Sequence, residues 1–189
     1  MSRLRQWSQL KYYVPRKILL GLREISLTLP LDELPKSVST LRSRNLREYG
    51  ESRQCALFCY GVSRALGMDV SFAHHEAADH DFIAAYRDGE DVNYVPVQMK
   101  EFVPTEVNAK ATLQAEIDKL EKYVDAADLC VAVHLNRAVR VEFGDLRIPK
   151  LNIGELWLFG ATSLSQENWI LVGNLLADPK VYEFEYPRI

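Results

Sequence analysis

Residues 81–100 have the sequence DFIAAYRDGEDVNYVPVQMK, and this stretch decides the fold. Two runs rich in apolar residues flank the polar segment DGED at 88–91, which is typical of a tight turn. We therefore predict a β-hairpin with strands over 81–87 and 92–100. Pro96 removes one backbone donor from the second strand, which predicts an edge position or a bulge there.

The centre of the turn also predicts which residues of the hairpin face each other. If Gly89 and Glu90 form the tip, Asp81 lies opposite Gln98. Because side chains alternate along a strand, Lys100 points to the same side as Gln98. We therefore expect a carboxylate, an amide and an ammonium group together at the open end of the hairpin.

These groups suit a divalent cation. Hard cations prefer oxygen ligands, which Asp81, the side-chain carbonyl of Gln98 and the backbone carbonyl of Met99 can supply. Lys100 is suited to bind a phosphate oxygen or to steer an attacking water. A metal held here would lower the pKa of that water and stabilise charge on a phosphate.

The segments around the hairpin predict a mixed α/β domain. Residues 51–66 carry an apolar stripe at helical spacing that stops before Gly67, so we predict a helix followed by a short strand at 69–74. After the hairpin, residues 113–124 have an amphipathic helical pattern, and residues 129–135 (LCVAVHL) predict a strand buried on both faces. Four more strands are expected, at 139–143, 155–159, 169–172 and 181–186.

The combination of Asp81 with Gln98-Met99-Lys100 resembles the PD-(D/E)xK superfamily of metal-dependent nucleases, also called restriction-endonuclease-like. In that family an Asp on the second core strand and a (D/E/Q)xK motif on the third form the site. The family core runs helix, three strands, helix, strand, which is similar to the order predicted here for residues 51–135. This chain departs from the motif at His80, where the family has Pro, and at Gln98, which is a neutral ligand.

The resemblance implies a restriction-endonuclease-like core with a β-rich C-terminal extension. The length of 189 residues favours one domain. We divide it into a basic N-terminal arm (1–50), a nuclease-like core (51–135) and the β-rich extension (136–189).

The resemblance also implies a site and an activity. Asp81 would be the chief metal ligand, Gln98 the secondary ligand and Lys100 the catalytic lysine. Glu51, an acid on the first core helix, would complete the metal shell, with Glu76 as the alternative. The implied activity is Mg2+- or Mn2+-dependent hydrolysis of DNA, with RNA as a further substrate to test and a homodimer as a common state of such enzymes.

Two alternatives stay open. Gln in place of the acid also occurs in family members that have lost activity, and a net charge of -3 gives no global attraction for nucleic acid. A catalytically decayed module that binds nucleic acid or protein is therefore the first alternative.

The second alternative is a zinc or other transition-metal site in the stretch HHEAADHD, from His74 to Asp81. His75 and His80 lie five residues apart between two predicted strands, so they do not form the helical HExxH motif. Either histidine could instead assist a nuclease site as a proton shuttle.

Composition bears on the cellular location and on the N-terminal part of the chain. Three cysteines form no complete disulfide framework, and no apolar run is long enough for a membrane span, so we expect a cytoplasmic chain with no membrane contact. Residues 1–53 contain eleven Lys or Arg and five Asp or Glu, which suggests either a phosphate-facing arm or a face that pairs with the acidic remainder. Prolines at 15, 30 and 35 predict no long regular element there, apart from a short helix over 34–46.

Overall fold

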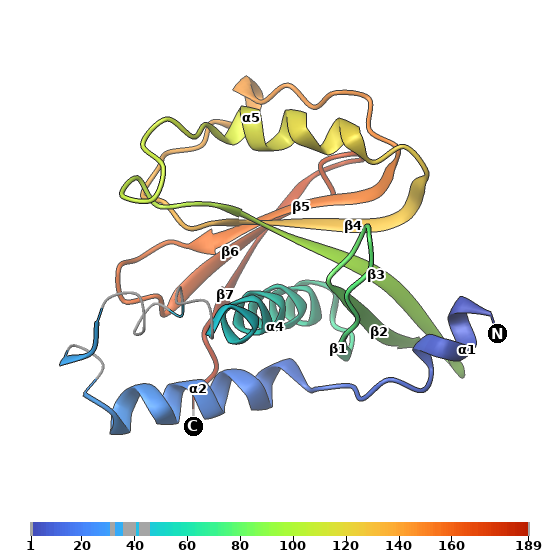
Figure 1. Ribbon diagram of the computed structural model, residues 1–189, viewed down its shortest axis with the longest axis horizontal. Coiled ribbons are helices and arrows are strands. Elements are labelled where there is room, and N and C mark those ends of the chain that lie inside the picture. The colour runs from blue at the N-terminus through green and yellow to red at the C-terminus, as the bar shows by residue number, and fades with distance from the viewer. Residues whose placement is uncertain (1, 31–32, 36–40, 42–45, 189) are drawn as a thin grey trace.

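The computed structural model describes residues 2–30, 33–35, 41 and 46–188. A mixed sheet is covered on one face by helices α4 and α2 and on the other by helix α5 (Figure 1). The strands are β1 (Val70–His74), β2 (Phe82–Asp88), β3 (Asp91–Phe102), β4 (Ala126–Leu135), β5 (Ile153–Ala161), β6 (Asn168–Gly173) and β7 (Lys180–Glu185). The helices are α1 (Arg3–Trp7), α2 (Pro15–Thr28), α4 (Arg47–Leu66) and α5 (Leu113–Asp118), with 3-10 segments η3 (Lys119–Lys122) and η4 (Phe143–Asp145).

The seven strands lie in the sheet in chain order. Strand β4 runs parallel to both β3 and β5, and every other neighbouring pair is antiparallel. The parallel pair β3–β4 requires a crossover, which α5 and η3 supply on one face. The predicted mixed α/β class is therefore confirmed.

The predicted hairpin register is confirmed over Phe82–Asp88; Asp81 lies just before the paired strand and contacts Gln98 through its side chain. Phe82 pairs with Val97 and Asp88 pairs with Asp91, with no shift between them, so no bulge forms at Pro96. The Val97 carbonyl accepts from the Asp81 N–H at 3.0 Å, and the preceding Pro96 nitrogen therefore points away from β2. The nitrogen points to the side of β4, but β3 pairs with β4 only from Val97 onward. The missing N–H of Pro96 therefore costs no hydrogen bond between strands.

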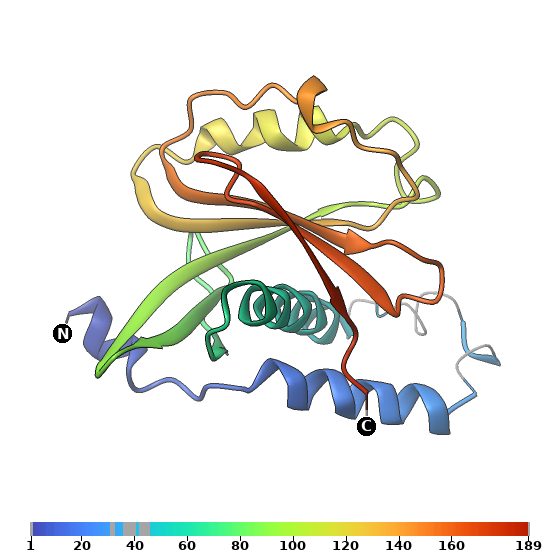
Figure 2. The same cartoon turned by 180° about the vertical axis from the view of Figure 1, so that it is seen from behind.

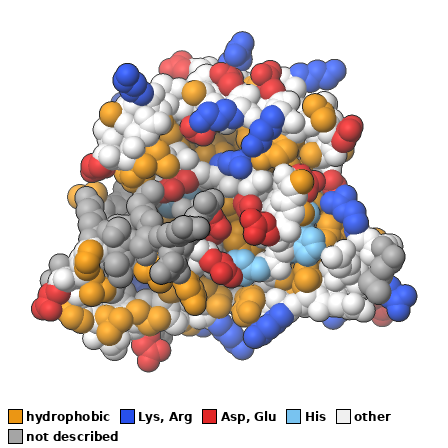
Figure 3. All heavy atoms as spheres, viewed as in Figure 1, with side chains coloured by type: hydrophobic (Ala, Val, Ile, Leu, Met, Phe, Trp, Pro, Cys, Tyr) orange, Lys and Arg blue, Asp and Glu red, His pale blue; other side chains and the backbone are white. Residues whose placement is uncertain are grey.

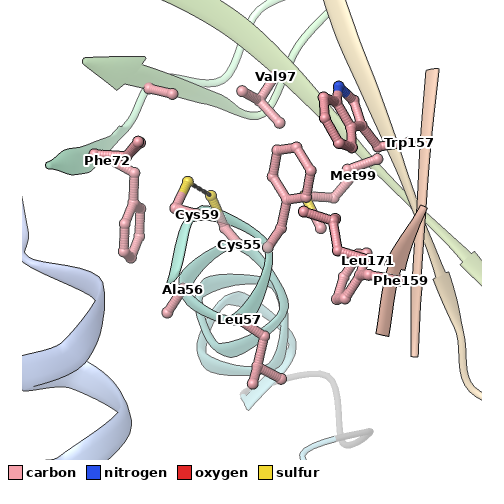
Figure 4. Close-up of a cluster of buried hydrophobic side chains, with 14 of the residues drawn as sticks. Cys55, Ala56, Leu57, Cys59, Phe72, Val97, Met99, Trp157, Phe159 and Leu171 are labelled. Atoms are coloured by element: carbon pink, nitrogen blue, oxygen red, sulfur yellow. Dashed lines mark hydrogen bonds between the residues drawn. The ribbon is translucent and has the colours of Figure 1, made fainter. Parts of the chain in front are cut away.

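Helix α4 packs its apolar stripe against the sheet. Cys55 and Cys59 are fully buried beside Phe72, Val97 and Met99 (Figure 4). The helix begins one turn earlier than predicted and ends as predicted at Gly67, which caps it in the left-handed conformation at φ 66°. The first turns of α4 lie beside the second half of β3, near Gln98 and Lys100.

The opposite face of the sheet forms a second core under α5. Leu129, Val131 and Val133 of β4 point into it, whereas Cys130 and Ala132 point to α4, so β4 is buried on both faces as predicted. The predicted helix over 113–124 is shorter than expected, because it tightens into η3 after Asp118.

Two predictions from sequence were wrong. Residues 139–143 form no strand, because β5 already has β4 and β6 as neighbours; instead Val141 packs over the second core. The prolines do not prevent regular structure near the N-terminus, since Pro15 is the first residue of the 14-residue helix α2. Most of the short helix expected over 34–46 lies outside the described residues.

Helix α2 belongs to the packed domain. Its Leu19 is fully buried, and the Leu19 carbonyl accepts from the Tyr186 hydroxyl at 3.0 Å, beside the C-terminal end of the chain (Figure 2). Ion pairs join Arg23 to Glu167 at 2.8 Å and Arg3 to Asp128 at 3.4 Å, so these basic residues pair with the acidic remainder. In the described part of the chain, no helix combines the length and apolar character needed to cross a membrane.

Candidate active site

A cleft of about 610 Å³ lies between the first turns of α4, the β1–β2 loop and the ends of β3 and β4. Glu51, Asp81, Gln98 and Lys100 all line it, together with Met99. The remaining lining residues are Leu41, Gly50, Arg53, Gln54, Ala77, Ala78, Glu101, His134 and Asn136. Figure 3 shows acidic side chains and histidines gathered on this face, with lysines and arginines next to them on the α5 side.

Asp81 lies directly before β2 and is held by the neighbouring strand. Its Oδ2 accepts from the Met99 N–H at 3.1 Å and from the side-chain amide of Gln98. Burial raises the pKa of the Asp81 carboxyl, and the charges of Glu51 and Glu76 raise it further. The hydrogen bond from the Met99 N–H and the charge of Lys100 lower this pKa. A nearby cation would favour the charged form of this carboxylate.

Gln98 is 7% exposed, and all of its amide groups are used. Nε2 donates to Asp81 and to the Met99 carbonyl at 3.2 Å, while Oε1 accepts from the Tyr123 hydroxyl at 3.1 Å. The amide oxygen therefore points away from Asp81 in this structure. Its predicted role as an oxygen ligand requires the amide to turn over.

Lys100 is half-buried two residues farther along β3. Burial lowers the pKa of its ammonium group, and the nearby charge of Lys122 lowers it further, whereas Asp81, Glu116 and Glu51 raise it. An ammonium group in this position lies beside the carboxylates of the cleft and next to a second cation, an arrangement suited to an anionic substrate.

The two acids proposed to complete the metal shell differ in position. Glu51 lines the cleft from α4, whereas Glu76 is exposed on the β1–β2 loop and is not among the lining residues. The charges of both act on Asp81, so both are near enough to influence a bound cation.

His75 and His80 form a hydrogen-bonded chain rather than lining the cleft. Asp79 accepts from Nδ1 of His80 at 2.6 Å, and Nε2 of His80 is 2.9 Å from Nδ1 of His75. Nε2 of His75 is 3.3 Å from the Gln6 amide, next to Trp7, whose ring meets His80 edge-on at a centroid distance of 6.0 Å. These contacts hold α1 on the β1–β2 loop.

The third histidine of the stretch lies apart from this chain. Nε2 of His74 is 2.6 Å from the Ser52 hydroxyl, on the first turns of α4. The imidazole nitrogens named here are thus engaged in hydrogen bonds with protein groups. Among the residues that the structure describes, no three His, Cys, Asp or Glu side chains form a group that could hold a metal ion.

The donor set at Asp81 is of another kind. It combines the Asp81 carboxylate and the Met99 carbonyl, which both accept from the Gln98 Nε2, with the oxygen of the Gln98 amide itself. Oxygen ligands of these three types are those used for Mg2+ and Ca2+ in proteins. The residues therefore fit a hard divalent cation, provided that Gln98 presents its oxygen.

Several polar residues around the site were missed from sequence. His134 and Asn136, at the end of β4, line the cleft, as does Glu101, which accepts from the Asn136 amide at 2.6 Å. Tyr123 reaches Gln98 from just beyond η3. The position of Glu101 directly after Lys100 was a signal in the sequence. His134, Asn136 and Tyr123 gave no such signal, because only the pairing of β3 with β4 and the crossover between them bring these residues to the site.

No family model, no curated protein and no solved structure matches this chain.

Proposed function

We propose that the protein is a Mg2+- or Mn2+-dependent nuclease of the PD-(D/E)xK type that hydrolyses phosphodiester bonds of DNA. The observation that carries the proposal is the meeting of Glu51, Asp81, Gln98 and Lys100 in one cleft. The order of α4, β1–β3, α5 and β4 supports it, because it is the order expected for a restriction-endonuclease-like core.

Each residue has a role in this proposal. Asp81, Gln98 and the Met99 carbonyl would hold the cation, with Glu51 on the opposite wall of the cleft. When bound, the cation would supply an activated water and stabilise charge on the scissile phosphate. Lys100 orients that water or binds a phosphate oxygen through its ammonium group.

Basic residues beside the cleft would bind the flanking phosphates. Lys122 is exposed on η3, with its Nζ 5.0 Å from the centre of the Tyr123 ring, and its charge acts on Lys100. Lys119 on the same segment is paired with Glu116 at 2.7 Å. We therefore assign phosphate binding to Lys122 rather than to Lys119.

A cleavage assay tests the proposal. Wild type, Lys100→Ala and the control Lys119→Ala are incubated with duplex, single-stranded and branched DNA and with RNA, in Mg2+, Mn2+ or EDTA. The proposal predicts metal-dependent cutting by wild type and Lys119→Ala, and a loss of at least about a hundredfold in Lys100→Ala. Equal cutting by all three proteins would contradict it.

A second candidate is a binding module with a decayed site. It is favoured by the orientation of Gln98, whose amide nitrogen fills the space between the oxygens of Asp81 and Met99. In that case no variant cuts, and wild type does not bind Mn2+ more tightly than Asp81→Asn.

A further inference from the structure

The side-chain amide of Gln98 occupies the position at which a cation would bind. Its Nε2 donates both hydrogens, one to Asp81 and one to the Met99 carbonyl. These are the same two oxygens that the proposed function assigns to the metal. The amide nitrogen therefore does for these oxygens what a cation would do, by placing positive charge density between them.

The opposite orientation of the amide places three oxygens together. The Gln98 Oε1 would then face Asp81 and the Met99 carbonyl without any hydrogen between them. Without a cation this arrangement is repulsive, and the present orientation is preferred because every polar group of the amide is paired. With a cation the three oxygens become ligands.

Tyr123 is suited to support either orientation. Its hydroxyl donates to Oε1 of Gln98 at 3.1 Å, and a hydroxyl can equally accept from an amide N–H. Tyr123 as a residue is only 8% exposed, so water has little access to replace that hydroxyl.

We propose that Gln98 is a two-position ligand that closes the metal site when it is empty and turns over when a divalent cation binds, with Tyr123 as the positioning residue for both orientations. This inference rests on the proposed function, because it requires a cation at Asp81. It explains how a neutral glutamine serves in place of an acid: the amide stabilises the half-buried Asp81 carboxylate in the metal-free protein, which a second carboxylate would not.

The first experiment follows the Gln98 side-chain amide by 15N NMR while Mg2+ is added to the full chain. The Gln98 signals are assigned by their absence in Gln98→Leu, and calorimetry on the same sample gives the Mg2+ affinity. We expect the Gln98 amide signals to shift with the calorimetric affinity, and the Mg2+ heat to disappear in Asp81→Asn. If Mg2+ binds through Asp81 while the Gln98 signals stay unchanged, the two-position ligand is wrong and the metal site survives. If no Mg2+ or Mn2+ binds, both proposals fail.

The role of Gln98 as a metal ligand is tested by a charge-adding variant. Gln98→Glu removes the amide nitrogen and adds a charged ligand, so we expect Mn2+ affinity to rise about tenfold or more. The matched control is Gln54→Glu, which adds the same charge to the same cleft from α4. An equal rise in both variants would show a general charge effect and would overturn the assignment of Gln98 as a ligand.

Tyr123→Phe tests the positioning role. Because the hydroxyl serves both orientations, its removal should change Mg2+ affinity by less than about threefold while altering the chemical shifts of the Gln98 amide in both the free and the Mg2+-bound protein. A change in affinity of tenfold or more would show that Tyr123 supports one orientation alone. Unchanged Gln98 signals in both states would show that Tyr123 does not position the amide.

Discussion

Replacing Gly61 by Ala would test whether the β-rich extension packs on the helix that carries Glu51. Gly61 lies inside α4, and a Cβ built there would be 2.7 Å from Cε1 of Phe184 on β7. The Phe184 ring cannot move freely, since it is stacked on Trp169 at 6.3 Å and meets Tyr60 edge-on at 6.0 Å. The methyl group must therefore displace packed aromatic rings.

The magnitude follows from two opposing effects. Alanine in place of a helical glycine gains about 1 kcal/mol of helix stability. Overpacking a well-filled core costs about 1–3 kcal/mol. Gly21→Ala is the matched control, because Gly21 also lies inside a helix, α2, and an added Cβ there would meet no other described atom within 4 Å. The free energy of unfolding of Gly21→Ala should rise by up to about 1 kcal/mol, and that of Gly61→Ala should lie below it by about 1–3 kcal/mol.

Urea unfolding followed by tryptophan fluorescence measures both variants. For a chain of this size, about 1 kcal/mol corresponds to a shift in Tm of roughly 2–4 °C, so a thermal scan gives an independent check. If Gly61→Ala stabilises the protein as much as Gly21→Ala, then Phe184 does not pack on α4 in solution. The extension would then not support the helix that lines the cleft.

Three further predictions concern charge, protonation and hydrogen bonding. Lys122→Ala should raise KM for DNA and reduce the salt dependence of binding, with kcat little changed, and an unaltered KM would contradict its assignment to phosphate binding. Burial raises the pKa of the Cys55 and Cys130 thiols above their usual value of 9.0, so only the unfolded chain ionises them as pH rises past about 9. The free energy of unfolding should then fall by about 1.4 kcal/mol per pH unit for each thiol, until the folded pKa is reached; urea unfolding at pH 8 and pH 10 without such a loss would show exposed thiols. His75→Ala should lower the free energy of unfolding by about 1–3 kcal/mol, because His80 is only 3% exposed and its Nε2 loses its hydrogen-bond partner. A stability equal to that of wild type would show that the hydrogen bonds from His80 through His75 to Gln6 do not form.

The part of the site that depends on local chemistry was predictable from sequence. A four-residue polar turn set the register of β2 and β3, and strand alternation then placed Asp81 beside Gln98. The contact between Tyr123 and the Gln98 amide was not predictable, because Tyr123 reaches it from beyond the crossover helix. A pattern along one strand contains no information on a hydroxyl that approaches from 25 residues away.

The failures elsewhere have equally specific causes. Pro15 was treated as a helix breaker, yet at the first position of a helix the missing N–H has no helical partner to lose. Residues 139–143 alternate like a strand, but β4 and β5, between which they lie in the chain, pair directly with each other and leave no place for a strand between them. Local pattern predicts what a segment can form, and the neighbours available in the fold decide whether it forms.

The most direct measurement is metal-dependent DNA cutting by wild type and Asp81→Asn, purified in parallel and assayed with Mg2+, Mn2+ and EDTA. Asp81→Asn keeps the size of the side chain but removes the charge that would bind the cation. The proposed site predicts cutting by wild type in Mg2+ or Mn2+, none in EDTA and a loss of at least about a hundredfold in Asp81→Asn. Cutting that is equal in both proteins, or absent from wild type under every condition, would contradict a nuclease centred on Asp81.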